Sequence, residues 1–487
     1  MSHSFADRLS AKKRANTPWL DASYVAAAAA CLDQLKADGV ETLRFVFPDQ
    51  HGLLRGKTVL TDAAVSAFTG GLGLPSTLLL KDTAHKTVFP VWDGDVSLGA
   101  TGLNGAQDVI AVPDPGTVTM LPWSPQSRIV LCDLYDRSGA AINIAPRAIL
   151  RRAMNALSEA GFAALMGLEV EFQVFERLND GRVHADATMP PAAIETQNLT
   201  QGWQYLTDAR YGATEELWDE LRRACGAMAL GLRTIEIEMG PSQFEFTFEP
   251  ADPMTQANRF VFFRTMVKEL CHRRGLHASF MAKPRLPNAA ANGWHIHQSL
   301  TEVTTGHPVF MPTDGQTLTP QADGWIAGLL EHAAAACLLT TPTINGYKRY
   351  GPFQLAPNRV AWGRDNRGAM IRALMYPGDG ASRIENRVAD TTANPYFAFA
   401  AQLLSGLDGI HRTAHAPPET NTPYASEFPV LPASLIDAVE AFDQSAFFRA
   451  AMGDTFVDYL CHIKRAEWAR YIGTVSEWEQ AEYFNMF

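Results

Sequence analysis

Five short stretches, far apart in the chain, alternate acidic, histidine or arginine side chains with apolar ones. In the first, residues 167–172, Glu169 and Glu171 occupy every second position. Alternate side chains of a β-strand share a face, so both carboxylates would lie opposite Leu168, Val170 and Phe172. The other four stretches are residues 235–238, 243–245, 294–297 and 383–387. Together they predict a curved sheet whose polar face lines a reaction chamber.

The acidic side chains of these stretches predict a metal site. Five carboxylates converging on one face could not all stay ionised without countercharge, which divalent cations would supply. Carboxylate-rich ligation with one or two imidazoles, here His295 and His297, favours Mg²⁺ or Mn²⁺ over zinc. One such pair alone is typical of a solvated strand edge, but five elements together favour a site. The glutamates are Glu169, Glu171, Glu238, Glu245 and Glu385.

A group of arginines follows in the chain. Guanidinium forks match phosphate and carboxylate oxygens, so arginines beside metal ions suggest phosphoryl transfer from a nucleotide. Two or three of them would be ordinary surface residues. The group consists of Arg349, Arg359, Arg364, Arg367, Arg372, Arg383 and Arg387.

The elements that must position these residues suggest an α+β protein of two domains. A chain of 487 residues exceeds one typical domain. A helix over 24–37, a strand over 42–47 and a β-rich segment over 58–135 form the first, for which we predict residues 1–138. Residues 139–487 form the second, in which helices over 146–160, 214–228 and 253–274 precede the polar strands and would cover the apolar back of a largely antiparallel sheet.

Composition narrows the functional class. The formal charge of -11 gives no basic field for nucleic acid or an anionic membrane. The six scattered cysteines form no C-x-x-C pair and are expected to be reduced thiols. No segment reaches the ~20 apolar residues that span a bilayer, so we expect a cytoplasmic protein acting on small molecules.

With these residues assembled, the chain resembles the glutamine synthetase family from about residue 41 to the C-terminus. The resemblance implies an N-terminal β-grasp domain, a catalytic domain, and active sites shared between neighbouring subunits of a homo-oligomer, usually a double-ring dodecamer. Its motifs are Gly-x-Glu-x-Glu-Phe (167–172), Glu-x-Gly-Pro-x-Gln-x-Glu (238–245), His-x-His-x-Ser-Leu (295–300), Tyr-Lys-Arg (347–349), Asn-Arg (366–367), Arg-Ile-Glu-x-Arg (383–387) and Asn-Pro-Tyr (394–396).

The resemblance assigns roles to residues that match the family's motifs. One metal site would use Glu171, Glu238 and Glu245, and the other Glu169, His295 and Glu385. At the nucleotide, ATP, the expected residues are His297 and Ser299, with Arg372 and Arg383 on its phosphates. At the substrates they are Arg349 on the glutamate carboxylate, Arg367 and Arg387 on the transferring phosphoryl group, Asn292 and Gly293 among the amino-acid contacts, Tyr205 in the amine pocket, and Asp49 reaching into the adjacent subunit's site.

The implied reaction is amide formation. ATP phosphorylates the γ-carboxylate of glutamate, metals and arginines absorb the developing negative charge, and an amine displaces phosphate. Water would hydrolyse the acyl phosphate, so a closing loop is expected.

One loop departs from the family's pattern. Where an ammonia-using relative carries a glutamate that takes a proton from ammonium, this chain has Leu355, with Phe353 and Gln354 beside it. The loss of the acid and the added apolar surface favour an organic amine, apolar or aromatic, over ammonia. Alternatives are a loop shifted by one residue with Asp49 or another acid doing this work, an ordinary glutamine synthetase, and a non-catalytic relative that keeps only the fold.

Overall fold

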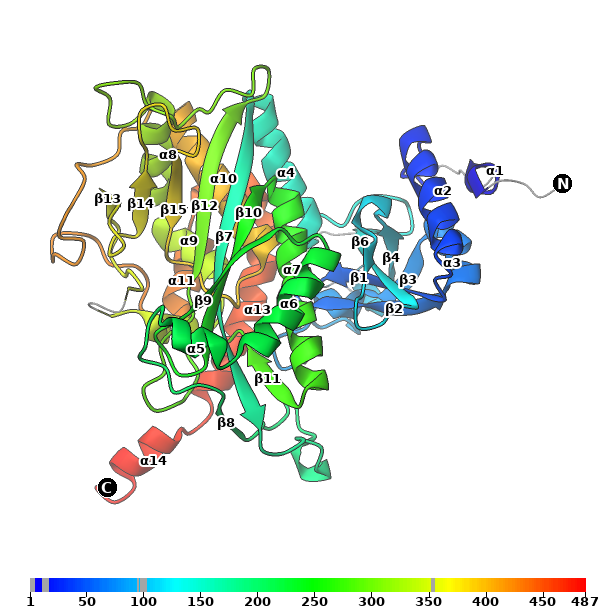
Figure 1. The fold of residues 1–487 in the computed structure, drawn as a ribbon, viewed down its shortest axis with the longest axis horizontal. Coiled ribbons are helices and arrows are strands. Elements are labelled where there is room, and N and C mark those ends of the chain that lie inside the picture. Colours follow the sequence, from blue (N-terminus) through cyan, green and yellow to red (C-terminus); the bar gives the residue numbers. More distant parts are fainter. Residues whose placement is uncertain (1–4, 11–16, 94–95, 97–102, 352–354) are drawn as a thin grey trace.

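The computed structural model describes residues 5–10, 17–93, 96, 103–351 and 355–487, and its strands form two sheets (Figure 1). The N-terminal sheet has the order β2-β1-β6-β4-β3, with β5 paired to β6, and its neighbours β1 and β6 run parallel. On β1 the side chains of Leu43, Phe45 and Phe47 alternate into the core, as the apolar pattern predicts. Its elements are α1 (Phe5–Ser10), α2 (Ala22–Ala37), β1 (Thr42–Pro48), β2 (Leu54–Leu60), α3 (Ala64–Gly70), β3 (Leu72–Pro75), β4 (Asp108–Pro113), β5 (Thr119–Met120) and β6 (Ser127–Tyr135).

The second sheet has nine strands in the order β13-β14-β15-β12-β7-β10-β9, with β8 and β11 also paired to β7. Every pairing is antiparallel except β13 with β14. The long strand β7 lies between β12 and β10 and carries both short strands. The strands are β7 (Phe162–Arg177), β8 (Thr196–Asn198), β9 (Leu232–Ile237), β10 (Gln243–Ala251), β11 (Leu276–Ser279), β12 (Trp294–Glu302), β13 (Trp362–Arg364), β14 (Ile371–Leu374) and β15 (Arg383–Asn386).

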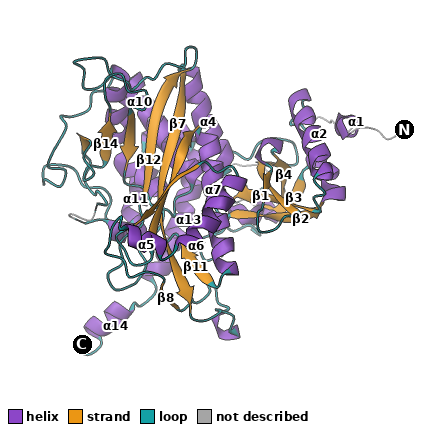
Figure 2. Cartoon of the chain, viewed as in Figure 1, coloured by secondary structure: helices purple, strands orange, loops and turns teal. Residues whose placement is uncertain are grey.

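Helices cover the apolar side of this sheet (Figure 2). Four of the helices begin with proline in the first turn, where the missing N–H costs no hydrogen bond: α4 (Pro146–Glu159), α7 (Pro253–Arg273), α8 (Pro320–Glu331) and α10 (Pro395–His411). Phe172 of β7 packs edge-on against Phe246 and Phe263 between sheet and helix α7. The remaining helices are α5 (Asp208–Gly212), α6 (Glu215–Ala227), α9 (Ala333–Thr340), α11 (Leu435–Asp443), α12 (Ala446–Met452), α13 (Asp454–Ile472) and α14 (Glu477–Tyr483).

The α+β prediction is confirmed, and all five polar stretches lie in or at the ends of neighbouring strands. Leu168, Val170 and Phe172 are buried on the face opposite the carboxylates. The predicted domain boundary at residue 138 falls in the turn between β6 and α4. Among the described helices, none combines the length and apolar character needed to cross a membrane.

A buried seam joins the N-terminal sheet to the helices behind the second sheet. The Asn394 side chain accepts from the backbone N–H of Tyr396 at the start of α10, and its amide group donates to the backbone carbonyls of Asp49 (3.0 Å) and Gln50 (3.3 Å). Arg264 of α7 donates to the carbonyl of Gly52 at 2.5 Å. The loop after β1 is therefore held by two helices of the other half.

Candidate active site

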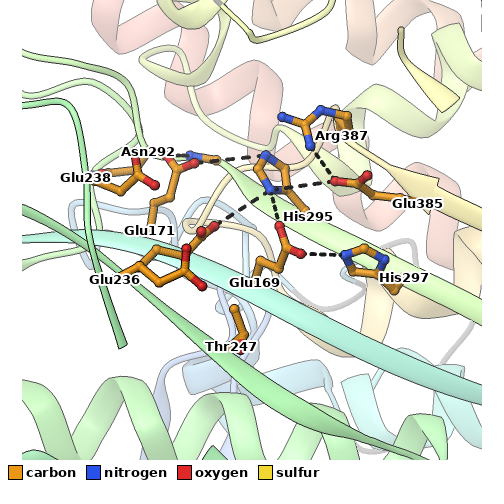
Figure 3. A network of polar contacts seen from close by, with 12 residues as sticks. Glu169, Glu171, Glu236, Glu238, Thr247, Asn292, His295, His297, Glu385 and Arg387 are labelled. Carbon is orange, nitrogen blue, oxygen red and sulfur yellow. Dashed lines mark hydrogen bonds and ion pairs between the residues drawn. The ribbon is translucent and has the colours of Figure 1, made fainter. Parts of the chain in front are cut away.

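Cross-strand pairing assembles the polar side chains on one face of the nine-stranded sheet (Figure 3). Residues directly opposite each other on paired strands point to the same side. His297 lies opposite Glu385, and His295 opposite Glu169. On the next pairing Glu171 lies opposite Glu245. The register thus forms a ladder across β15, β12, β7 and β10, which Glu238 extends from the end of β9.

His295 lies at the centre of this ladder. Its Nδ1 is 2.9 Å from Glu169 Oε2, 3.7 Å from Glu245 Oε1 and 3.8 Å from Glu385 Oε1. Its Nε2 is 4.0 Å from Glu171 Oε1. Ligand atoms within 4.8 Å of one another fall into three groups: Glu171, Glu238 and Glu245; Glu169, Glu245 and His295; and Glu169, His297 and Glu385.

The groups match the donor chemistry of a two-cation centre. Carboxylate oxygens with one or two imidazoles suit Mg²⁺ or Mn²⁺. Glu245 Oε1 is buried and accepts no hydrogen bond, and a cation would satisfy it. The group of Glu171, Glu238 and Glu245 is the same as the first metal site expected from sequence. A ring nitrogen of His297 lies 2.9 Å from a Glu169 carboxylate oxygen, the same distance as for His295. His297 could therefore also ligate a cation that Glu169 binds.

Burial and mutual repulsion govern protonation of the carboxylates. Burial raises the pKa of Glu238 to about 8, with the charge of Glu171 adding to the effect. The pKa of Glu245 is raised well above its usual range by burial and then by Glu171. Burial opposes ionisation of Glu169 too, but hydrogen bonds from His295 and His297 outweigh it and lower its pKa. Without a cation, the cluster therefore holds protons near neutral pH.

The metal-free protein is expected to lose thermal stability as pH rises from about 4.5 to about 8. A carboxyl group whose pKa is raised by folding binds more protons in the folded state. It therefore leaves the free energy of unfolding unchanged below its unfolded pKa and lowers that free energy by its full amount above its folded pKa. Bound Mn²⁺ compensates the charges and should flatten this dependence. Thermal melts across this pH range in EDTA and in Mn²⁺ measure the difference, and equal slopes in both would contradict the prediction.

Glu385 is enclosed by arginines at the other end of the ladder. Arg372 Nη1 donates to Glu385 Oε2 at 3.1 Å, and Arg387 donates to Oε1. Arg383 Nε donates to His297 Nδ1 at 3.2 Å. Burial opposes ionisation of Glu385, but the nearby charges, Arg387 first, lower its pKa. These three predicted phosphate-side arginines thus lie beside the histidines and Glu385.

Arg349 and Gly293 lie close together beside His295. Arg349 is 2% exposed, donates from Nη1 to the Val388 carbonyl at 3.0 Å, and keeps a buried Nε without a partner. The backbone N–H of Gly293 donates to Glu171 Oε2 at 2.7 Å. A Cβ at residue 293 would lie 3.0 Å from His295 Nε2 and 3.5 Å from Arg349 Nη2, so the glycine keeps space open between them.

Asn292 is placed behind this space. Its amide nitrogen donates to the Met281 carbonyl at 2.7 Å and to Gln173, while its oxygen accepts from Gln243 at 3.0 Å. Gln243 also donates to Glu171 at 3.2 Å. The buried amides of Asn292 and Gln243 therefore hold Glu171 and the Gly293 backbone in position.

The predicted amine side forms a polar and apolar rim next to Glu238. The backbone N–H of Trp203 donates to the Met239 carbonyl at 2.7 Å, which lays the segment containing Tyr205 along the end of β9. Burial and the charges of Glu238 and Glu245 raise the pKa of Tyr205 to about 12, while Arg367 opposes them. The side chains of Trp203, Tyr205 and Met239 are all exposed.

Two predicted residues, Leu355 and Ser299, lie away from the ladder, and a third, Phe353, lies outside the described residues. Leu355 is 49% exposed with a φ of 55°, and Phe353 lies outside the described residues. Ser299 is half-buried on β12, two residues beyond His297. The prediction that Phe353 and Leu355 contact the amine stays a prediction.

Asp49 is not part of this chain's cluster. Its buried carboxylate accepts from the backbone N–H groups of His51 and Leu53, both at 2.9 Å, and from Arg55 Nε at 2.8 Å. In this chain the side chain organises the 49–53 turn. Its role in an adjacent subunit's site stays a prediction.

Glu236 is a site residue that the sequence analysis missed. It lies opposite Glu245 on β9, and its charge contributes to the raised pKa of both Glu238 and Glu245 (Figure 3). Its spacing of two from Glu238 was the available signal. Glu236 adds a sixth carboxylate to this face.

The fold and this site define an ATP-dependent carbon–nitrogen ligase, and the chain belongs to the glutamine synthetase family: residues 143–483 match the family described as "Glutamine synthetase, catalytic domain". Among individual proteins, it is 35% identical to a γ-glutamylanilide synthase of Acinetobacter sp, over 97% of this chain and 98% of that one. A glutamine synthetase of Halobacterium salinarum is 31% identical, over 94% and 96%. A solved structure of GmaS with ADP superposes with a TM-score of 0.79 at 26% identity, over 93% and 99%. The predicted family is confirmed.

Proposed function

We propose that this enzyme joins the γ-carboxylate of L-glutamate to an organic amine, using ATP and two or three divalent cations per site, Mg²⁺ or Mn²⁺, through a γ-glutamyl phosphate. The observation that carries the proposal is the ladder of seven side chains that could ligate a metal, with Arg372 and Arg387 on Glu385 and Arg349 beside Gly293. The identity to a γ-glutamylanilide synthase supports an amine other than ammonia.

The chain's own residues divide the work. Glu169, Glu171, Glu238, Glu245, His295 and Glu385 would hold the cations, which neutralise charge on the phosphates when bound. His297, Ser299, Arg372 and Arg383 would orient ATP, with His297 also within ligand distance. Arg349 would bind the glutamate carboxylate, close to the open space at Gly293 and Asn292. Arg367 and Arg387 would stabilise the transferring phosphoryl group.

The amine side favours a neutral, apolar nucleophile. Leu355 supplies no acid to hold an ammonium ion, and Trp203, Tyr205 and Met239 expose aromatic and thioether surface beside Glu238. An aromatic amine is already neutral near pH 7 and needs no base before it attacks. We therefore propose an apolar or aromatic amine as substrate, aromatic in preference, with Phe353 and Leu355 contacting its apolar part.

The assembly belongs to the same proposal. Asp49 acts in a neighbouring subunit's site, in a homo-oligomer that is a double-ring dodecamer of the cytoplasm. Sedimentation of the purified protein measures this state, and a monomer with full activity would contradict it. No nucleic acid or membrane takes part.

An amine panel tests the function. Phosphate release with glutamate, ATP and Mn²⁺ is measured for ammonia, putrescine, ethanolamine, isopropylamine and aniline. We expect aniline to give the highest kcat/KM, at least about tenfold above ammonia, since the pocket offers apolar contact and no cation site. Ammonia winning by a wide margin identifies an ordinary glutamine synthetase, and absence of both turnover and Mn²⁺ binding identifies a non-catalytic relative.

The variant Leu355→Glu isolates the loop in the same panel. A restored carboxylate should raise kcat/KM for ammonia and lower it for aniline, while KM for ATP stays unchanged. An unaltered ratio between the two amines would show that Leu355 does not face the amine.

A further inference from the structure

A cavity of about 270 Å³ lies at the seam between the two halves, away from the metal cluster. Helices α7, α9 and α13 form it together with the 391–392 segment and the loop after β1. None of the metal-site glutamates or histidines lines it. It is thus separate from the site of amide formation.

The cavity is positively charged. Arg264 and Lys268, one turn apart on α7, line it with Lys464 of α13, and no carboxylate of the described residues does. Arg264 donates to two backbone carbonyls, of Gly52 at 2.5 Å and Thr391 at 3.3 Å. Lys268 Nζ donates to the Ala278 carbonyl at 3.1 Å. Within the described part of the chain, neither α7 cation has an ion-pair partner, whereas Lys464 is paired with Glu467 at 3.0 Å.

Desolvation disfavours the charge of both cations, and Arg264 adds to the effect on Lys268. Desolvation lowers the pKa of Arg264 to about 10, partly offset by Asp49. Desolvation, and then the charge of Arg264, lowers the pKa of Lys268. Buried charges are normally paired, so an anion would supply the partner that the buried Arg264 guanidinium lacks, with Lys268 at the solvent-exposed edge of the cavity.

One part of the wall is apolar, and polar side chains such as Gln50, Thr343 and Asn394 line the remainder. Leu338 and Leu339 of α9, Phe397 of α10 and Leu460 of α13 contribute side chains that are buried in the core. Small-molecule sites are concave, mostly apolar and carry a few charged groups that fix orientation. A molecule of about ten non-hydrogen atoms, charged at one end, suits this lining and volume.

We propose that this cavity is a second ligand site, which binds a small organic monocarboxylate with an apolar body. The carboxylate lies on Arg264 and Lys268, and the body lies against Leu338, Leu339 and Phe397. One wall residue, Met281, also gives its carbonyl to Asn292, which supports the Gly293 backbone of the active site. The occupied cavity therefore shares a structural element with the glutamate side.

Calorimetric titration with benzoate tests the site on the full-length protein. Benzamide has nearly the same shape as benzoate but carries no charge. Lys268→Met removes one of the two cations, at a position that solvent reaches. Because a charged hydrogen bond is lost, we expect the affinity for benzoate to be about tenfold or more lower in Lys268→Met than in wild type. For the same reason, we expect wild type to bind benzamide about tenfold or more weakly than benzoate. Arg273→Met, on the same helix outside the cavity, should bind benzoate as wild type does.

Arg349→Lys separates this site from the glutamate pocket. Benzoate affinity should be unchanged in that variant. The proposal is overturned if benzoate fails to bind at millimolar concentration, if Lys268→Met binds it as wild type does, or if Arg349→Lys abolishes binding. Because binding is the readout, these outcomes do not depend on which amine the enzyme uses.

Discussion

Replacing Glu245 by glutamine is expected to lower kcat/KM by about three orders of magnitude or more, while the metal-free protein becomes no less stable. Glu245 belongs to two of the three ligand groups, and its Oε1 is buried without a hydrogen bond. Glutamine keeps the shape but is a weaker metal ligand without charge, and a thousandfold loss corresponds to about 4 kcal/mol of transition-state stabilisation.

The opposite effect on stability follows from the same repulsion. Burial and neighbouring carboxylates raise the pKa of Glu245 well above its usual range. The folded protein therefore keeps Glu245 protonated or, at higher pH, is destabilised by an uncompensated charge. A neutral amide removes that penalty above the unfolded pKa. In EDTA the variant should therefore melt at or above the wild-type temperature, most clearly at high pH.

Three measurements on one preparation decide this: steady-state kinetics, Mn²⁺ titration by calorimetry, and melting in EDTA. Glu249→Gln, an exposed position further along β10, is the matched control and should leave all three unchanged. Retained Mn²⁺ affinity in Glu245→Gln would remove this residue from the ligand set.

Arg349→Lys is expected to raise KM for glutamate about a hundredfold with a smaller change in kcat. Arg349 is 2% exposed, and Nη1 is already used by the Val388 carbonyl, which leaves its other nitrogens to face the space at Gly293. A lysine ammonium cannot make the bond to Val388 and a bidentate contact to a carboxylate at once. Losing such a charge-assisted contact costs about 2–3 kcal/mol, which corresponds to this factor.

Initial rates with glutamate varied at saturating ATP measure the effect. Arg364→Lys is the matched control, because that guanidinium is exposed and pairs with Glu419 on the surface. A loss in kcat alone, with KM for glutamate unchanged, would instead assign Arg349 to the phosphoryl group.

Sequence alone predicted the five strands because a spacing of two has one structural meaning in a sheet. It also placed Glu171, Glu238 and Glu245 together, through the family's motifs. It could not determine the register between strands, and the register brings His297 opposite Glu385 and Glu236 opposite Glu245. Register depends on long-range packing, which local spacing does not encode.

Two other features depend on local geometry that residue types do not reveal. The Asp49 carboxylate accepts hydrogen bonds from His51, Leu53 and Arg55, a local network that the residue types alone did not predict. Leu355 has a φ of 55°, a left-handed conformation that costs a branched residue energy and that no propensity scale predicts for leucine.

The amide of Asn394 has a mechanical consequence. Its oxygen accepts from the backbone N–H of Tyr396 in the first turn of α10, and its nitrogen donates to the backbone carbonyls of Asp49 and Gln50. The turn that carries Asp49 is therefore fixed to the helices that pack behind the metal cluster. If that turn reaches a neighbouring subunit, a displacement at one active site is transmitted to the next through the hydrogen bonds of Asn394 and Arg264.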